Sequence, residues 1–326
     1  MRYYLAVAAA LALQASAAHA DTIVGLVGED ILATFDSRTA KTTALTKIDG
    51  IGPVLGVDVR PADGQLYALA SDGTVAIVDP ATGKTTVKSK LDTLPPEGIQ
   101  VSVDFNPVAD KLRIIGSDGT NLRANVDDGK VTQDQPLKFA DADQAAGQTP
   151  GVVAGAYANS VKGTKETTLY DIDVAQGGLF RQAPPNDGIL NSIGMTGLDV
   201  ETVGFDIATD AAGNNTGMLV AKGNLYTLDL TSGKAVSGKA IAGLPSGIRD
   251  IAVLAKPIVK QAATMNVDVM TVKPTAAMTS DYLPKPTAGT MGAAMPKSTQ
   301  QMKVDYSTQR SAYAAPKMKR GPQCDR

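Results

Sequence analysis

A short phrase recurs along this 326-residue chain at intervals of about fifty residues. Each copy places two small or apolar residues at alternate positions and ends in Asp. The copies are Ala33–Asp36, Ala76–Asp79, Ala124–Asp127 and Tyr226–Asp229. Three of them continue into turns rich in Thr, Ser or Gly. A repeat of this length, made of short strands and turns, is typical of a β-propeller.

The repeat can be divided into units of four strands. One complete unit consists of residues 55–61, 65–70, 74–79 and 84–88, and further units begin near residues 101, 153 and 203. Alternation with period two and Gly-containing turns predict antiparallel strands joined by hairpins. The sequence therefore predicts an all-β fold with five four-stranded blades.

The two ends of the repeat region complement each other. Residues 22–27 occupy a second-strand position, whereas residues 248–254 form a first strand that no further strand follows. Paired together, they complete one blade, which closes the ring and removes its open edge.

The first twenty residues have the features of a secretory signal. Arg2 precedes an apolar run over residues 5–13, and Ala18-His19-Ala20 is a small–x–small cleavage site. We expect cleavage after Ala20 and a periplasmic or extracellular location. No other stretch approaches the roughly 20 apolar residues of a membrane-spanning helix.

Composition changes near Pro257. Residues 257–326 are rich in Pro, Ala, Thr, Met and Lys without periodicity, which predicts a low-complexity disordered tail after a propeller domain at 21–256. The predicted domain carries 20 basic and 29 acidic residues, whereas the tail carries 10 and 4. An acidic domain argues against nucleic-acid binding. The tail is interpreted as a solvated extension, with contact to anionic surfaces as the alternative.

The scarcity of three residue types limits the possible chemistry. His19 is the only histidine and Cys324 the only cysteine, and the chain has no Trp. After signal cleavage the protein would lack histidine, which excludes histidine-based triads and histidine metal sites. One cysteine cannot form an intramolecular disulfide.

Several segments resemble those of a bacterial secreted family known as domain of unknown function 4394. The segments occur in the family's order at residues 103–113, 119–123, 169–173 and 184–188. The resemblance covers residues 22–255 and implies a propeller-like repeat fold in an exported protein. It implies no activity, cofactor or catalytic residue.

Carboxylates recur on the predicted first strands, at Asp58, Asp104, Asp206 and Asp250, with Ala156 at the fifth position. First strands line a propeller's central channel, so these groups could bind Ca²⁺ through several oxygens. They could also supply the paired acids of a glycosidase. The alternative is structural, because a buried carboxylate can accept backbone N–H groups of a neighbouring blade.

A second set of carboxylates ends the third strands, at Asp36, Asp79, Asp127, Asp173 and Asp229. Asp before a small-residue turn accepts hydrogen bonds from the backbone two residues on. We interpret this set as structural.

Irregular loops are further candidates, because loops on a rigid scaffold often carry function. The segments at residues 139–148 and 181–188 offer possible ligand contacts through Asp141, Asp143, Arg181, Asn186 and Asp187. A third polar loop covers residues 209–215. Asp141 and Asp143 do not make an EF-hand loop, because the further ligands and the late Glu of that pattern are missing.

The tail contains seven of the ten methionines. Thioethers and the Cys324 thiolate are soft ligands suited to Cu(I), but their spacing is irregular. Compositional drift and oxidant scavenging are the other interpretations. The methionines are Met265, Met270, Met278, Met291, Met295, Met302 and Met318.

The leading hypothesis from sequence is a secreted monomeric propeller that binds a protein, an envelope component or a glycan without catalysing a reaction. A carboxylate-dependent carbohydrate-active enzyme and a Ca²⁺-binding propeller are alternatives, although the chain offers no Trp platform for a sugar. A third hypothesis places metal or surface binding in the Met-rich basic tail.

Overall fold

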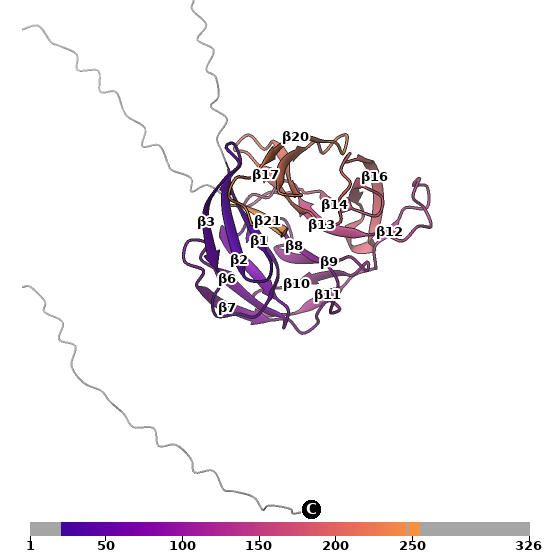
Figure 1. The fold of residues 1–326 in the computed structure, drawn as a ribbon. Coiled ribbons are helices and arrows are strands. Elements are labelled where there is room, and N and C mark those ends of the chain that lie inside the picture. The colour runs from indigo at the N-terminus through magenta and orange to yellow at the C-terminus, as the bar shows by residue number, and fades with distance from the viewer. Residues whose placement is uncertain (1–20, 246, 255–326) are drawn as a thin grey trace, which may run out of the picture. The chain divides into compact units, whose positions relative to one another are not determined.

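Figure 1 shows the fold in a computed structural model, which describes residues 21–245 and 247–254. The described strands form five small sheets arranged around a common centre, a five-bladed β-propeller (Figure 1). The predicted signal peptide and tail lie outside the described residues.

Each blade begins with a first strand at the centre, and its later strands follow outward. Blade 1 consists of β21 (Ile248–Leu254), β1 (Thr22–Val27), β2 (Ile31–Asp36) and β3 (Lys41–Lys47). Blade 2 consists of β4 (Val54–Arg60), β5 (Gln65–Ala70), β6 (Thr74–Val78) and β7 (Thr85–Lys90). Blade 3 consists of β8 (Val101–Asn106), β9 (Lys111–Gly116), β10 (Asn121–Ala124) and β11 (Val131–Gln133).

The remaining two blades differ in strand number. Blade 4 consists of β13 (Val152–Tyr157), β14 (Leu169–Asp173), β15 (Gly178–Gln182) and β16 (Ile189–Met195), with β12 (Lys138–Phe139) parallel to β16 at its outer edge. A 3₁₀ turn, η1 (Pro185–Asp187), lies between β15 and β16. Blade 5 consists of β17 (Gly204–Thr209), β18 (Asn215–Ala221), β19 (Asn224–Leu228) and β20 (Ala235–Ala240).

The predicted closure of the ring is confirmed. Strand β21 pairs antiparallel with β1, from Thr22 opposite Leu254 to Val27 opposite Ile248. The predicted blade count is also confirmed, and blade 4 alone among the described sheets has a fifth strand. Two paired residues are too few to produce a period in the sequence, so β12 could not be predicted.

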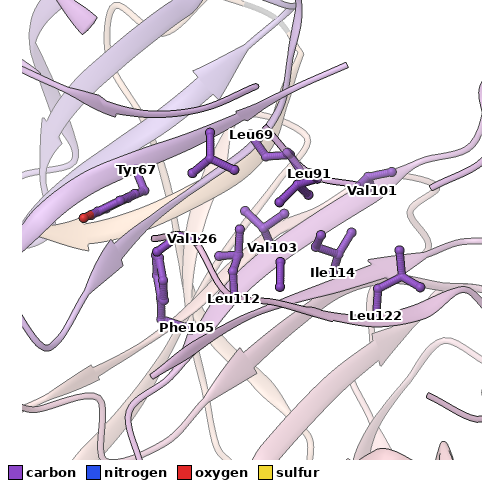
Figure 2. Close-up of a cluster of buried hydrophobic side chains, with 12 residues drawn as sticks. Tyr67, Leu69, Leu91, Val101, Val103, Phe105, Leu112, Ile114, Leu122 and Val126 are labelled. Atoms are coloured by element: carbon purple, nitrogen blue, oxygen red, sulfur yellow. The ribbon is translucent and has the colours of Figure 1, made fainter. Parts of the chain in front are cut away.

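The core lies between the blades, because each sheet buries apolar side chains on both faces. Five buried clusters occupy the five junctions between neighbouring sheets. Figure 2 shows the cluster between blades 2 and 3, where Val103 and Leu112 of blade 3 pack near Leu69 of blade 2. In the same cluster the rings of Tyr67 and Phe105 meet edge to face, with centroids 5.3 Å apart.

The repeat phrase ends in turns, as predicted. The Oδ1 atom of Asp36 accepts the Thr39 N–H at 2.7 Å, and the Oδ1 atom of Asp79 accepts the Ala81 N–H at 2.8 Å. One member of the second set of carboxylates is misplaced in the prediction, because Asp173 ends β14, the second strand of blade 4. Asp127 has a structural role, as interpreted, but through a side chain of another blade and not through its own turn. Its carboxylate binds the Arg60 guanidinium at 2.7 Å, because Arg60 from blade 2 reaches across the junction.

Candidate functional site

The four recurring aspartates lie on the innermost strands. Asp58 lies on β4, Asp104 on β8, Asp206 on β17 and Asp250 on β21, and each is at most 4% exposed. These strands neighbour one another around the centre of the ring. The first strand of blade 4 has the small buried Ala156 at the corresponding position.

Each aspartate accepts an N–H from the first strand of the next blade. Asp58 binds the N–H of Phe105 at 2.7 Å, and Asp104 binds that of Tyr157 at 3.0 Å. In the same direction around the ring, Asp206 binds the Val253 N–H at 2.6 Å and Asp250 binds the Val57 N–H at 2.9 Å. These contacts join neighbouring blades at four of the five junctions.

The junction between blades 4 and 5 lacks such a contact from the first strand because Ala156 has no carboxylate. The Oδ1 atoms of Asp206 and Asp250 also accept the N–H of the next residue on their own strands, at 2.5 Å from Ile207 and 3.1 Å from Ile251. The ring of carboxylates is therefore asymmetric around the centre.

Three of the carboxylates converge. One oxygen from each of Asp58, Asp104 and Asp206 lies within 4.8 Å of the other two. Burial, followed by the neighbouring charges, raises the pKa of Asp58 and Asp104 well above the usual range. Burial also raises the pKa of Asp206 to about 6.

The four carboxylates could serve two roles, contact between blades and cation binding. Each carboxylate holds its neighbouring blade through one hydrogen bond, and carboxylate oxygens can accept more than one bond. Three converging carboxylate oxygens would also suit a hard cation such as Ca²⁺, which takes six to eight oxygen ligands.

The five candidate loop residues have separate surroundings. Asp143 accepts the Ser192 N–H at 2.6 Å and the Ser192 hydroxyl at 2.7 Å, which fastens residues 140–148 to β16. Asn186 accepts a hydrogen bond from the buried Arg113 at 2.9 Å. The other three, Asp141, Arg181 and Asp187, are exposed.

The fastened loop encloses one side of a pocket over blade 4, with a volume of about 200 Å³. Three glutamines, Ser192, Met195 and Phe180 contribute to the pocket, and its lining includes no charged side chain. Gly178 and Gly194 also contribute to it. The glutamines are Gln144, Gln148 and Gln176.

A wider cleft of about 840 Å³ lies between blade 5 and the start of β21. Its lining combines apolar side chains with two acidic and two basic ones, Asp199, Glu201, Lys222 and Arg249. Arg249 donates hydrogen bonds to the carbonyls of Gly28 and Val54, so its guanidinium holds neighbouring loops. The sequence did not indicate this cleft, because its lining comes from separate connections.

A family model matches residues 31–252, more than half of the chain. The chain belongs to the family described as domain of unknown function DUF4394. The predicted resemblance is thereby confirmed. The description of the DUF4394 family assigns no activity, and no curated protein matches this chain.

The DUF4394 chain is also similar to solved structures from Bacteroides. A protein of unknown function from Bacteroides thetaiotaomicron is 16% identical with a TM-score of 0.44, over 73% of this chain and 65% of that one. An auxiliary nutrient binding protein from the same species is 14% identical with a TM-score of 0.39, over 61% and 53%. Another, from Bacteroides ovatus, is 15% identical with a TM-score of 0.38, over 64% and 53%.

These similarities are too distant to carry an argument about function. This chain spans about half the length of the two nutrient-binding proteins. Within residues 21–245 and 247–254 of the DUF4394 chain, no helix has the length and apolar character to cross a membrane.

Proposed function

We propose that this protein is an exported, non-catalytic binding propeller that takes a small neutral ligand rich in hydroxyl groups. A single sugar unit of a glycan is the prime case. The observation that supports the proposal is the pocket over blade 4, where three carboxamides lie beside apolar side chains and no charged side chain contributes to the lining.

Carboxamides suit such a ligand because each offers donors and an acceptor at once. Gln176 donates to the Oε1 atom of Gln148 at 3.0 Å, which orients both amides and leaves further donors and acceptors for a ligand. Gln144 is exposed at the pocket and adds a third amide. Neutral hydroxyl groups can pair with all of these without the cost of burying an ion.

The apolar part of the pocket depends on glycine. A Cβ atom at Gly178 would lie 3.2 Å from the Phe180 ring and 3.1 Å from the Gly194 carbonyl. The absence of that atom leaves space beside the ring. The loop opposite is held by Asp143, so binding would require little ordering of the protein.

Burial of the axial carboxylates favours binding over catalysis. A glycosidase needs both acids within reach of the sugar, whereas Asp58, Asp104, Asp206 and Asp250 are at most 4% exposed and bind backbone N–H groups. Export rests on the signal sequence predicted at residues 1–20.

The test is calorimetric titration with neutral monosaccharides, and with uronic acids and sugar phosphates for comparison. The protein is purified after expression of the full chain. We expect a neutral sugar to bind, and Gly178→Ala or Gln144→Ala to weaken binding about tenfold, as for loss of one or two hydrogen bonds or contacts. Gln65→Ala changes an exposed glutamine in blade 2 and is the matched control.

Two results would count against the pocket. One is equal affinity in the wild type and in Gly178→Ala. The other is a preference for charged sugars, because the lining offers no counter-charge.

A second candidate function is binding of a divalent cation at the axis. It is supported by the three converging carboxylates, whose charges a cation would offset. Metal or surface binding by the tail remains a prediction, since residues 257–326 lie outside the described part of the chain.

A further inference from the structure

Two polar side chains at the junction of blades 3 and 4 have no partner for their oxygens. Asp171 is 0% exposed and Gln182 is 1% exposed. Neither carboxylate oxygen of Asp171, nor the Oε1 atom of Gln182, accepts a hydrogen bond from any described residue. Leaving such groups unpaired is costly, so a partner of another kind is expected.

We propose that Asp171 and Gln182 bind a buried divalent cation of the Ca²⁺ type. All three unpartnered atoms are acceptors, so the missing partner must supply positive charge or hydrogen-bond donors. A hard cation fits, because Ca²⁺ is bound by bidentate carboxylates, amide oxygens, backbone carbonyls and water.

Strand register brings the two side chains together. Asp171 lies opposite Phe180, and Leu169 lies opposite Gln182, so Asp171 and Gln182 are diagonal neighbours on one face of blade 4. Diagonal neighbours are within reach of each other when side chains are long. The Nε2 atom of Gln182 donates to the Pro185 carbonyl at 2.6 Å, which fixes the amide and directs its Oε1 atom elsewhere.

The backbone of β13 approaches Asp171 closely, and only glycine fits there. Gly155 lies opposite it on β13, and a Cβ atom there would be 2.7 Å from the Oδ1 atom of Asp171 and 2.7 Å from Ile115. Any other residue at position 155 would press on the carboxylate.

The nearest cation of the protein is already paired. Arg113 donates to Asp134 at 2.5 Å, to Asn121 at 2.8 Å and to Asn186 at 2.9 Å, and no hydrogen bond joins it to Asp171. Asp134 also binds Arg123 at 2.7 Å. Among the described residues, the Asp171 carboxylate therefore has no counter-ion in contact. Burial raises the pKa of Asp171 well above the usual range, and the charge of Arg113 only partly opposes this.

Protonation of Asp171 is the alternative to a bound cation, and it accounts for fewer of the unpartnered oxygens. A protonated Asp171 could donate to the Oε1 atom of Gln182, but its second oxygen would remain without a donor. One cation satisfies all three oxygens.

The test measures unfolding temperature against Ca²⁺ concentration after removal of metal with a chelator. We expect Ca²⁺ to stabilise the wild type by several degrees. In Asp171→Asn the concentration that gives half of the effect should rise at least tenfold. Asp173→Asn is the matched control, because Asp173 lies on the same strand, is equally buried, and accepts N–H groups from Gly151 and Gln176.

A crystal of the wild-type protein grown with Ca²⁺ gives a result that does not depend on whether a variant folds. The proposal predicts an anomalous peak between Asp171 and Gln182. The proposal is overturned if the crystal shows no peak and an Asp171 oxygen lies within hydrogen-bond distance of the Gln182 Oε1 atom, as a protonated Asp171 would. It is also overturned if only ordered water lies between the two side chains, or if Asp171→Asn leaves the response to Ca²⁺ unchanged. A peak only at the axis would support the axial cation and overturn this one.

Discussion

Arg113 is the largest of the side chains that the described propeller buries almost completely. Its guanidinium contacts Tyr157, Asn121, Asp134 and Asn186, which belong to β13, β10 and two connections. A buried cation is tolerated only when it is paired and its donors are satisfied. One side chain thereby fixes how blades 3 and 4 meet.

Replacing Arg113 with Met should lower the free energy of unfolding by about 3 kcal/mol, because Asp134 and Asn121 would lose a buried partner. Urea unfolding followed by circular dichroism measures the change. Arg181→Met alters an exposed arginine and should change stability by less than about 0.5 kcal/mol. Similar values for the two variants would contradict the structural role of Arg113.

The sequence indicated some of these residues and not others. Recurrence identified Asp58, Asp104, Asp206 and Asp250 as a set on first strands, which the structure confirms. Arg113 and Asp171 occur once each at their strand positions and have no repeat to mark them. Alternation in residues 169–173 does place Asp171 and Asp173 on one face, but it cannot show that only Asp173 finds N–H partners.

The turn between the third and fourth strands is the element that locks adjacent blades. In blade 2 the turn contains Gly83, with φ +73°, and its position leaves no room for a Cβ atom beside the Lys47 carbonyl of blade 1. The Asp49 N–H donates to the Gly83 carbonyl at 2.9 Å. Blade 3 repeats the arrangement, with Gly129 against the Lys90 carbonyl.

Gly83→Ala and Gly64→Ala form a matched pair, since Gly64 has φ +72° but no atom within 4 Å of an added Cβ. The left-handed backbone alone should cost about 1 kcal/mol at Gly64. At Gly83 the Lys47 carbonyl must move as well, and the total should reach about 3 kcal/mol. Thermal unfolding distinguishes the two, and equal losses would show that the turn does not lock the blades.

For the strands and turns, the sequence predicted most of the fold, because the repeat phrase marks both the end of a strand and the turn that packs on the preceding blade. It could not show why the glycine recurs. The reason is that a backbone carbonyl of the preceding blade lies too close for a Cβ atom, and this contact cannot be inferred from the residues next to the glycine in sequence.

Across the whole molecule, the axial carboxylates make stability depend on pH. The usual pKa of an aspartate in an unfolded chain is about 3.9. Burial raises the pKa of Asp206 to about 6 and also raises those of Asp58, Asp104 and Asp250 well above their usual range. The folded protein therefore keeps protons that the unfolded chain releases, and stability falls as pH rises above about 4.

We expect the unfolding temperature, measured in the presence of a chelator, to fall by about 5 °C or more between pH 5 and pH 7.5. Asp206 by itself contributes to this fall, since its pKa is about 3.9 in the unfolded chain and about 6 in the folded protein. Asp206→Asn should reduce this slope. Asp210→Asn should not, because Asp210 is exposed and local hydrogen bonds lower its pKa, so its contribution changes only below about pH 4.

Calcium should flatten the same profile if the axis binds a cation, because a bound cation favours ionised carboxylates. Asp104→Asn should then weaken the response to Ca²⁺. An unchanged pH profile at saturating Ca²⁺ would contradict the axial site and leave the four aspartates as contacts between blades.

The seam between β1 and β21 also determines how the ring responds to mechanical force. Thr22 and Leu254 lie opposite each other at the same end of an antiparallel pair. Tension applied through the two ends of the described chain therefore loads the first backbone hydrogen bond of that pair before the others. The ring would open like a zipper, one residue pair at a time from Thr22 towards Val27, at a lower force than shearing all six pairs together.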